Sequence, residues 1–480
     1  MSNERNKVLI DKAQAHLLEF KRFQKLGLIP VHGDFFASGV HYPPITMYEP
    51  KTFQDMYETY TLPEDGMMDI YVHIPFCIRR CLFCHYPSLY RANDSKKDEY
   101  LDALEKEMGI FLKMMDIEKI NARTILMGGG TPTDLTPAQL KRFLTFFTKF
   151  VNLDKCKQYN WDVDPSTLVG TDGIERLKII KDFGGDRLTV GIQSLDDGIL
   201  KKMNRSHDSS VAIESIRNCQ KLDFKLNVEL IFGHPGQTFD NWIEVLDKTV
   251  ALGTPEIQFY RLKVEPYGDQ EGSIKKYRDY HADELPPADD AILMKQIAIE
   301  VMEENGYKEN LRRVFTKKRS DISLYAFNQC CQLLDEIGFG LTAFSSLRDR
   351  FVLNTQYFED YYKKISEGVL PLNRGIIRSK EEQIRWSTIL PLKNYFIRKK
   401  RFEEINGFPI SQVFQEKIDQ LKQYDLVEET DSRIELTKKG AFFADEIVEQ
   451  FHSDKYIAFP KSDYNKGPLN PYDNQINLNL

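Results

Sequence analysis

The sequence lacks long apolar runs and lacks a large excess of charge of either sign. No apolar run in the 480 residues approaches the roughly 18 residues of a membrane span, so no transmembrane helix is predicted. The 65 basic and 72 acidic side chains give a net charge of −7, which argues against a protein that coats nucleic acid. The N-terminal segment has no apolar core followed by a small-residue cleavage site, so no signal peptide is predicted. We therefore expect a cytoplasmic protein without membrane or nucleic-acid partners.

Cysteine is also scarce, and its distribution is uneven. The seven cysteines are an odd number in a large chain, which argues against a framework of disulfide bonds. Three of them, Cys77, Cys81 and Cys84, lie within eight residues of one another, which calls for a chemical reason. The other four are expected to be ordinary thiols: Cys156, Cys219, Cys330 and Cys331.

What the sequence does contain is a regular alternation of two kinds of segment. Short runs rich in β-branched residues predict six strands, at residues 69–75, 123–127, 159–163, 187–192, 226–232 and 257–262. Amphipathic segments predict helices at residues 98–115, 137–151, 173–183, 209–222 and 238–252, with another at 288–305. Six βα units indicate an α/β fold with a parallel sheet, either open or rolled into a partial barrel.

The remaining segments interrupt this alternation and divide the chain. We expect five regions: an N-terminal extension (1–65) with a helix at 11–25, a core (66–270), an extension of the core (271–375), a mainly helical, winged-helix-like region (376–455) and a loosely ordered tail (456–480). A basic stretch is interpreted as a solvated helix end, with contact to carboxylate groups of a substrate as the alternative; it comprises Arg312, Arg313, Lys317, Lys318 and Arg319.

The three clustered cysteines follow the first predicted strand, at its carboxyl end. In folds built from βα units, that edge of the sheet carries the functional site. Three thiolates on one loop suit a [4Fe–4S] cluster that keeps one iron open for a non-protein ligand. The same residues with His85 suit a Cys₃His zinc site, although structural zinc sites favour two separated pairs of ligands. Thiols without any metal are the third alternative that the spacing leaves open.

The segment YVHIPFCIRRCLFC (71–84) closely resembles the signature of radical S-adenosylmethionine (SAM) enzymes, in the form found in the oxygen-independent coproporphyrinogen III oxidase family. The resemblance implies a partial (β/α)6 radical SAM barrel in which the three cysteines hold a [4Fe–4S] cluster. The open iron would chelate SAM, and reduction would give a 5′-deoxyadenosyl radical. Further segments resemble the family in the same order: MGGGTPTDL, DVDPSTL, RLTVGIQS, NVELIFGHPGQT, QFYRLKVEP and IGFGLTAFS.

The resemblance also assigns residues to the cofactor and to catalysis. A first SAM would contact Tyr71, Gly129, Asp162 and Phe344. A second SAM would contact Phe83, Gly130, Thr131, Gln193, Arg205, Glu229 and Arg261. Four positions depart from the family: it usually has Glu at Asp162, Asp at Glu229, an apolar residue at His234 and, in the oxidase, a further Cys at Tyr86. The candidate catalytic residues are Glu229, His234 and Tyr86, with packing of a turn as the alternative role for His234.

Three functions fit this resemblance. The first is oxidative decarboxylation of coproporphyrinogen III propionates to vinyl groups, favoured by the 76 residues ahead of Cys77. The second is a radical methyltransferase, cyclopropanase or anaerobic heme-degrading enzyme that uses two SAM molecules. The missing Cys at Tyr86, together with Glu229, Arg261 and His234, fits this function at least as well. The third is a heme-binding chaperone, although LNTQYF (353–358) lacks the His and Trp of that branch's heme motif. The partners expected are a tetrapyrrole or other small-molecule substrate and an electron donor such as flavodoxin or ferredoxin, with the chain a monomer.

Overall fold

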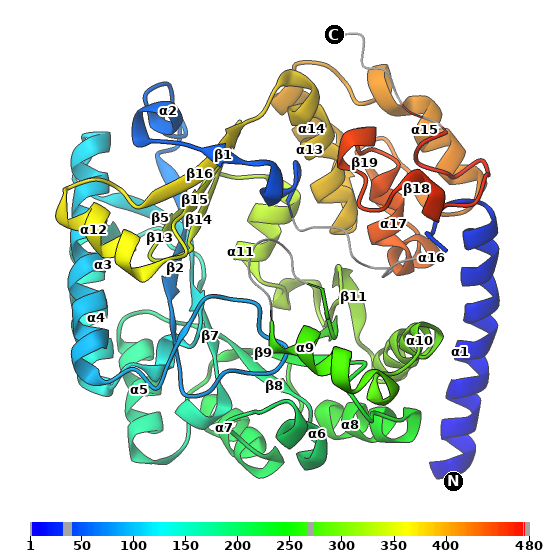
Figure 1. The fold of residues 1–480 in the computed structure, drawn as a ribbon, viewed down its shortest axis with the longest axis horizontal. Helices are drawn as coiled ribbons and strands as arrows, with labels where there is room; N and C mark the ends of the chain where they lie inside the picture. Colours follow the sequence, from blue (N-terminus) through cyan, green and yellow to red (C-terminus); the bar gives the residue numbers. More distant parts are fainter. Residues whose placement is uncertain (1, 32–40, 266–271, 474, 476–480) are drawn as a thin grey trace.

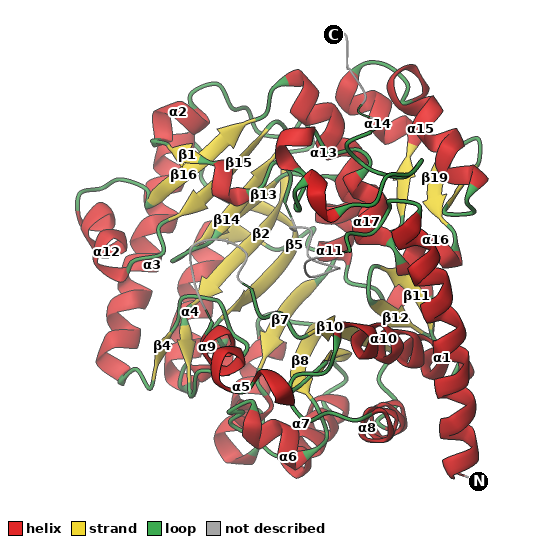
Figure 2. Cartoon of the chain, turned by 45° about the vertical axis from the view of Figure 1, so that its right-hand side comes forward, coloured by secondary structure: helices red, strands yellow, loops and turns green. Residues whose placement is uncertain are grey.

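A mixed β-sheet with helices packed around it forms the centre of the molecule (Figures 1 and 2). The computed structural model describes residues 2–31, 41–265, 272–473 and 475. Within these residues, six neighbouring strands run parallel in the order β2-β5-β7-β8-β9-β10. Their bounds are β2 (Met67–Ile74), β5 (Ile120–Gly129), β7 (Tyr159–Val163), β8 (Arg187–Gln193), β9 (Lys225–Phe232) and β10 (Glu256–Arg261). All six predicted strands are therefore confirmed.

The connecting helices cover the outer face of this parallel sheet. They are α3 (Asp94–Met115), α4 (Pro137–Phe150), α5 (Gly170–Asp182), α7 (Ser209–Lys221), α8 (Phe239–Ala251) and α10 (Ala288–Glu304). The apolar stripe of α4, with Phe143 and Phe147 fully buried, illustrates why these segments are helical and why they pack inward. The predicted helices are confirmed, whereas the short helix α6 (Asp197–Lys202), in the loop after β8, was not predicted.

Further strands extend the sheet at both edges. Next to β2 lies β13 (Glu336–Phe339), which runs parallel to β2. The strands beyond it pair antiparallel, in the order β14 (Phe344–Leu347), β15 (Arg350–Asn354), β16 (Leu372–Ile377) and β1 (Glu49–Pro50). Beyond β10 lies the hairpin of β12 (Val314–Thr316) and β11 (Lys308–Leu311). The hairpin corrects the interpretation of the basic stretch as a solvated helix end. Arg312 and Arg313 stand at its turn, and both form ion pairs with the buried carboxylate of Asp445.

A small three-stranded sheet lies in the C-terminal region. Its strands are ordered β17-β19-β18, with bounds β17 (Phe396–Arg398), β18 (Val427–Glu429) and β19 (Arg433–Leu436). Helices α13 (Lys380–Lys393), α14 (Lys399–Asn406) and α15 (Ser411–Gln423) pack with it, followed by α16 (Lys438–Phe442) and α17 (Ala444–Glu449). The structure thus has the helix and hairpin expected here, while the winged-helix assignment and the region boundaries stay predictions.

The segment after residue 455 packs against the N-terminal region. Helix α1 (Ser2–Lys25), longer than the predicted 11–25, runs along the side of α10 (Figure 1). Leu469 is fully buried, and its N–H donates to the Leu26 carbonyl oxygen at 3.0 Å. The prediction of a loosely ordered tail is therefore wrong up to residue 473, whereas residues 474 and 476–480 lie outside the described residues. Among the described helices, none is both long and apolar enough to cross a membrane.

Candidate functional site

The three clustered cysteines lie on a loop that begins at the carboxyl end of β2. Cys77 belongs to the two-residue strand β3 (Phe76–Cys77), and Cys81 and Cys84 follow in the loop. Two hydrogen bonds fasten this loop to the end of α6: Leu82 N–H donates to the Met203 carbonyl oxygen at 3.0 Å, and the Asn204 amide donates to the Arg80 carbonyl oxygen at 2.7 Å. None of the three cysteines is fully buried. The loop is therefore held in place by its backbone rather than by burial of the cysteines.

The glycine-rich loop after β5 packs directly against Cys77. A Cβ atom at Gly130 would lie 2.9 Å from Cys77 Sγ and 2.6 Å from the Phe76 carbonyl oxygen, so no larger residue fits without a shift. Gly129 has a φ of +109°, and a Cβ there would meet the His73 ring at 2.7 Å. The Thr131 hydroxyl lies 3.9 Å from Cys77 Sγ. Neighbouring atoms thus leave no room for a Cβ atom at either position. At Gly129 the positive φ is a second reason for glycine.

Arg205 connects the cysteine loop to the ends of β7 and β8. One guanidinium nitrogen donates to Cys81 Sγ at 2.8 Å, and the other donates to Asp164 Oδ2 at 2.9 Å and to the Gly191 carbonyl oxygen at 2.7 Å. Burial alone would raise the pKa of Asp164, but the Arg205 guanidinium and the hydrogen bonds from His207 and Ser166 lower that pKa overall. Sequence reasoning missed Asp164, although a second acid two residues after Asp162 was a visible signal.

Gln193 is buried at the carboxyl end of β8, and His234 is buried just after the end of β9. Gln193 has a φ of +62°, and its Oε1 atom is buried without a hydrogen-bond partner in the described chain. The His234 ring nitrogens approach the backbone of Gln193 and Ile231 without reaching good hydrogen-bond geometry. Burial lowers the pKa of His234 to about 4, so the imidazole is neutral at pH 7. Both side chains thus keep unused hydrogen-bonding capacity next to the predicted site.

Two carboxyl groups lie on the inner face of the sheet, on strands that flank β8. Burial raises the pKa of Asp162 on β7, and burial together with repulsion from Asp162 raises the pKa of Glu229 on β9. The Tyr260 hydroxyl lies 3.2 Å from Glu229 Oε1 and donates to it. A Cβ at Gly128 would lie 3.1 Å from Asp162 Oδ2 and 3.2 Å from the Tyr71 ring. The two carboxyls can therefore hold a proton between them at neutral pH.

Aromatic side chains stand on the β2 side of these carboxyls. The Tyr71 ring stacks on Phe344 with 5.3 Å between centroids, and its hydroxyl contacts His73 Nδ1 at 2.8 Å. On the other side of the cysteine loop, the Arg205 guanidinium lies 5.8 Å from the Phe83 ring centroid. Tyr86 is 61% exposed, so it stands at the rim rather than inside. The structure thus brings Tyr71 and Phe344 into contact, and Phe83 next to Arg205.

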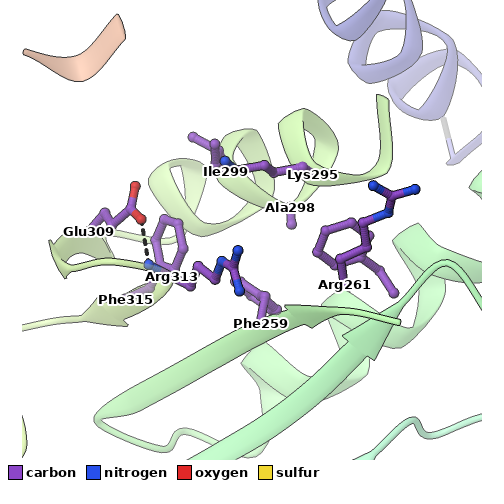
Figure 3. A pocket seen from close by; sticks show the side chains of 9 residues that line it. Phe259, Arg261, Lys295, Ala298, Ile299, Glu309, Arg313 and Phe315 are labelled. Carbon is purple, nitrogen blue, oxygen red and sulfur yellow. Dashed lines mark hydrogen bonds between the residues drawn. The ribbon is translucent and has the colours of Figure 1, made fainter. Parts of the chain in front are cut away.

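Arg261 lies at the end of β10, where it lines a narrow cavity of about 20 Å³ (Figure 3). The cavity is bounded by Lys295 on α10 and by Glu309 and Arg313 of the β11–β12 hairpin. The Glu309 carboxylate accepts the Arg313 N–H at 2.6 Å. A volume of this size holds about one water molecule, so the cavity itself admits no larger ligand. The structure therefore places Arg261 in the same cavity wall as Lys295 and Arg313.

The donor set fits an iron–sulfur cluster better than a zinc ion. The His85 Nδ1 atom accepts the Gly272 N–H at 2.9 Å and Nε2 contacts the Lys263 carbonyl oxygen at 3.2 Å, so both ring nitrogens are engaged elsewhere. Among the described residues, no three His, Cys, Asp or Glu side chains are close enough to enclose one metal ion. Tetrahedral zinc needs sulfur atoms about 3.8 Å apart, whereas a four-iron cluster binds each thiolate at a different iron. The three neighbouring thiols, the close approach of the glycine-rich loop to Cys77 and the unpartnered Gln193 oxygen fit a cluster with a polar ligand beside it.

Comparisons with known proteins agree with this geometry. Residues 71–249 match the radical SAM superfamily. Heme chaperone HemW of Bacillus subtilis is 27% identical over 392 residues, which cover 80% of this chain and 99% of the chaperone. The oxygen-independent coproporphyrinogen III oxidase of Helicobacter pylori is 26% identical over 417 residues, which cover 83% of this chain and 88% of the oxidase.

A solved structure has the same fold. Coproporphyrinogen III oxidase (HemN) from Escherichia coli superposes with a TM-score of 0.72 at 23% sequence identity, covering 86% of this chain and 96% of the oxidase. The match confirms the α/β fold that was predicted. The radical SAM match implies a [4Fe–4S] cluster and S-adenosylmethionine as cofactors, as expected from the cysteine segment. The assignment of individual residues to these cofactors stays a prediction.

Proposed function

We propose that this chain, whose residues 71–249 match the radical SAM superfamily and which is similar to oxygen-independent coproporphyrinogen III oxidases, cleaves S-adenosylmethionine reductively and acts on a tetrapyrrole. The reaction proposed first is oxidative decarboxylation of coproporphyrinogen III propionates to vinyl groups. The observation that carries the proposal is the Arg205 guanidinium, which contacts both Cys81 Sγ and Asp164 beside two carboxyl groups of raised pKa.

In this proposal Cys77, Cys81 and Cys84 hold the cluster. When bound, the cluster and S-adenosylmethionine would supply a 5′-deoxyadenosyl radical able to abstract a hydrogen atom from the substrate. Arg205 orients the cysteine loop, because it ties Cys81 Sγ to the end of β8 through the Gly191 carbonyl oxygen. An external electron donor such as flavodoxin or ferredoxin delivers the reducing electron.

The inner-face groups bind and orient the organic ligands. Tyr71 and Phe344 offer an aromatic wall, and Asp162 offers an acceptor for an ammonium or hydroxyl group next to Gly128. Glu229 accepts a hydrogen bond from Tyr260 and holds a proton at the inner face of the sheet. The raised pKa of Glu229 suits proton transfer near neutral pH. Gln193 offers its unpartnered oxygen to a donor on the cofactor.

A second candidate is a radical methyl- or methylene-transferring enzyme with two S-adenosylmethionine molecules. The observation that favours it is Tyr86, which stands exposed where the oxidase has a further cysteine. A heme chaperone role is the third candidate, supported by the match to HemW over 99% of that chaperone. Against it, Asn354 and Tyr357 belong to a segment without the His and Trp of the heme motif.

One experiment separates the three candidates. The cluster-loaded protein is incubated anaerobically with dithionite and S-adenosylmethionine, with and without coproporphyrinogen III. Deoxyadenosine together with CO₂ supports the oxidase. S-adenosylhomocysteine together with a methylated or methylene-bridged product supports the transferase. Tight heme binding without either product supports the chaperone, and the absence of any S-adenosylmethionine cleavage contradicts the proposal.

A further inference from the structure

A second, larger cavity lies at the opposite end of the parallel strands from the cysteines. Its volume is about 620 Å³, within the usual range of small-molecule sites. One wall comes from η5 (Arg319–Asp321) and α11 (Leu324–Phe327), and the other comes from β17 and the β18–β19 hairpin. The Leu324 N–H donates to Gln158 Oε1 at 2.7 Å, directly before β7 begins. The cavity therefore joins the amino-terminal ends of the core strands to the C-terminal sheet, away from the site proposed above.

Four cations and no acidic residue line this cavity. The lining residues are Arg319, Ser320, Ile322, Leu324, Phe327, Phe396, Arg398, Lys400, Ser432 and Arg433. Two ion pairs compensate part of this charge: Arg433 with Glu435 at 2.9 Å and Lys400 with Glu404 at 4.0 Å. Arg398 donates to the neutral amide of Gln332 at 3.2 Å. In the described part of the chain, Arg319 forms no ion pair. The cavity thus carries a surplus of positive charge.

Aromatic rings hold the guanidinium groups in place. The Phe396 ring centroid lies 5.4 Å from the Arg319 guanidinium and 5.6 Å from that of Arg433, and Arg398 lies 5.4 Å from the Phe327 centroid. A cation–π contact orients a guanidinium without cancelling its charge, so its N–H groups remain able to bind an anion. The arrangement is therefore preorganised for an anionic ligand.

The pairing of β17 with β19 places two of these cations directly opposite each other, which destabilises the sheet when no anion is bound. Arg398 on β17 is paired directly opposite Arg433 on β19. Like charges at directly opposed antiparallel positions destabilise a sheet, and a sequence under selection only for folding would avoid them. An anion between the two guanidiniums converts that repulsion into attraction. The register therefore points to a ligand independently of the cavity's shape and lining.

We propose that this cavity binds a small polyphosphate, such as a nucleoside triphosphate or inorganic tripolyphosphate. Adjacent phosphates match several guanidinium forks at once, which a single carboxylate does not. The concave shape and a net charge of −7 favour a small molecule over nucleic acid or an acidic protein surface. A bound polyphosphate links α11 to the C-terminal sheet and stabilises the contact between them.

Titration calorimetry on the full-length, cluster-loaded protein under anaerobic conditions tests the proposal. Tripolyphosphate, ATP and citrate are compared, so that phosphate, nucleotide and carboxylate recognition are distinguished. We expect saturable binding of both phosphates at one site per chain, a rise in thermal unfolding temperature, and weaker binding of citrate. Tighter binding of ATP than of tripolyphosphate identifies the nucleotide as the ligand.

Charge-reversal variants locate the site. The double variant Arg319→Glu/Arg398→Glu should weaken phosphate binding by about a hundredfold, or tenfold for each charged contact, and abolish the thermal shift. Both residues are exposed, so the variant should fold, and unchanged deoxyadenosine formation checks this. Arg217→Glu, on the exposed face of α7, is the matched control and should bind normally. Equal affinity in the double variant, no binding to the wild type, or binding of nucleic acid alone overturns the proposal.

Discussion

The two ends of the parallel strands differ in how their buried polar side chains are paired. At the amino-terminal end, Arg187 donates to Glu256 at 2.5 Å and both side chains are almost fully buried. Nearby, the Asp69 carboxylate accepts hydrogen bonds from Thr124, Asn328 and Gln329 at 2.7, 3.1 and 2.9 Å. Most polar atoms of these side chains are paired with one another, with Arg187 Nε as an exception.

At the carboxyl-terminal end, several polar groups are left without a complete set of partners. Burial, together with repulsion from Asp162, raises the pKa of Glu229, and the Gln193 oxygen has no donor in the described chain. The contrast teaches that burial of charge alone does not mark a site. What marks it is buried hydrogen-bonding capacity that the protein itself leaves unused.

The largest effect is expected at the carboxyl-terminal end, from Cys81→Ala. Removing one of three thiolates should abolish both the visible absorbance of the cluster and the cleavage of S-adenosylmethionine, because the remaining two cannot hold the cluster. Iron content, absorbance and deoxyadenosine are measured together. Cys156→Ala, a thiol outside the loop, should retain all three, and an intact cluster spectrum in Cys81→Ala would refute the ligand assignment.

At the amino-terminal end, Arg187→Ala should instead destabilise the fold. It leaves Glu256 buried without its partner, which costs about 3–5 kcal/mol of unfolding free energy. Urea unfolding of the variant measures this loss. Arg187→Met combined with Glu256→Leu should recover most of it, because both charges are then gone. A single variant as stable as the wild type would contradict the structural role of the pair.

Arg205→Lys is expected to have a smaller effect, confined to turnover. Lysine cannot donate at once to Cys81 Sγ, Asp164 and the Gly191 carbonyl oxygen, so the cysteine loop loses its fixed orientation. Deoxyadenosine formed per cluster should fall about tenfold while iron content stays near that of the wild type. Arg217→Lys serves as the control. Turnover equal to the wild type would show that Arg205 does not position the loop.

The smallest expected effect is the contribution of Glu229 to the pH dependence of the unfolding free energy. Its pKa is raised above the ordinary 4.5, so it stabilises the fold at low pH, and this contribution is lost as the pH rises through the raised pKa. The unfolding free energy of the wild type relative to Glu229→Gln should therefore fall with rising pH, by at most about 1.4 kcal/mol per pH unit. Urea unfolding from about pH 5 to pH 8 measures it. Parallel curves would contradict the raised pKa, and Glu244→Gln, on the exposed side of α8, should show no such trend.

Much of the core was predictable because its signals are local. The strand β2 is a buried run of eight residues, and α4 shows a helical apolar stripe with a Thr136 cap, so periodicity identifies both. Asp164 was missed because its importance depends on Arg205, which lies 41 residues later in the chain. The hairpin at Arg312 and Arg313 was misinterpreted because their partner Asp445 belongs to another region. Contacts distant in sequence leave no pattern for periodicity to detect.

The packing of Leu469 on the segment after α1 has a consequence for the order in which the protein folds. The hydrogen bond between Leu469 and Leu26 joins residues more than 440 positions apart, and contacts of such separation form late because closing the intervening loop costs entropy. During synthesis, α1 leaves the ribosome long before its last packing surface exists. The parallel core can assemble from neighbouring βα units in the meantime. The N-terminal segment therefore completes its packing only after the rest of the chain has folded around it.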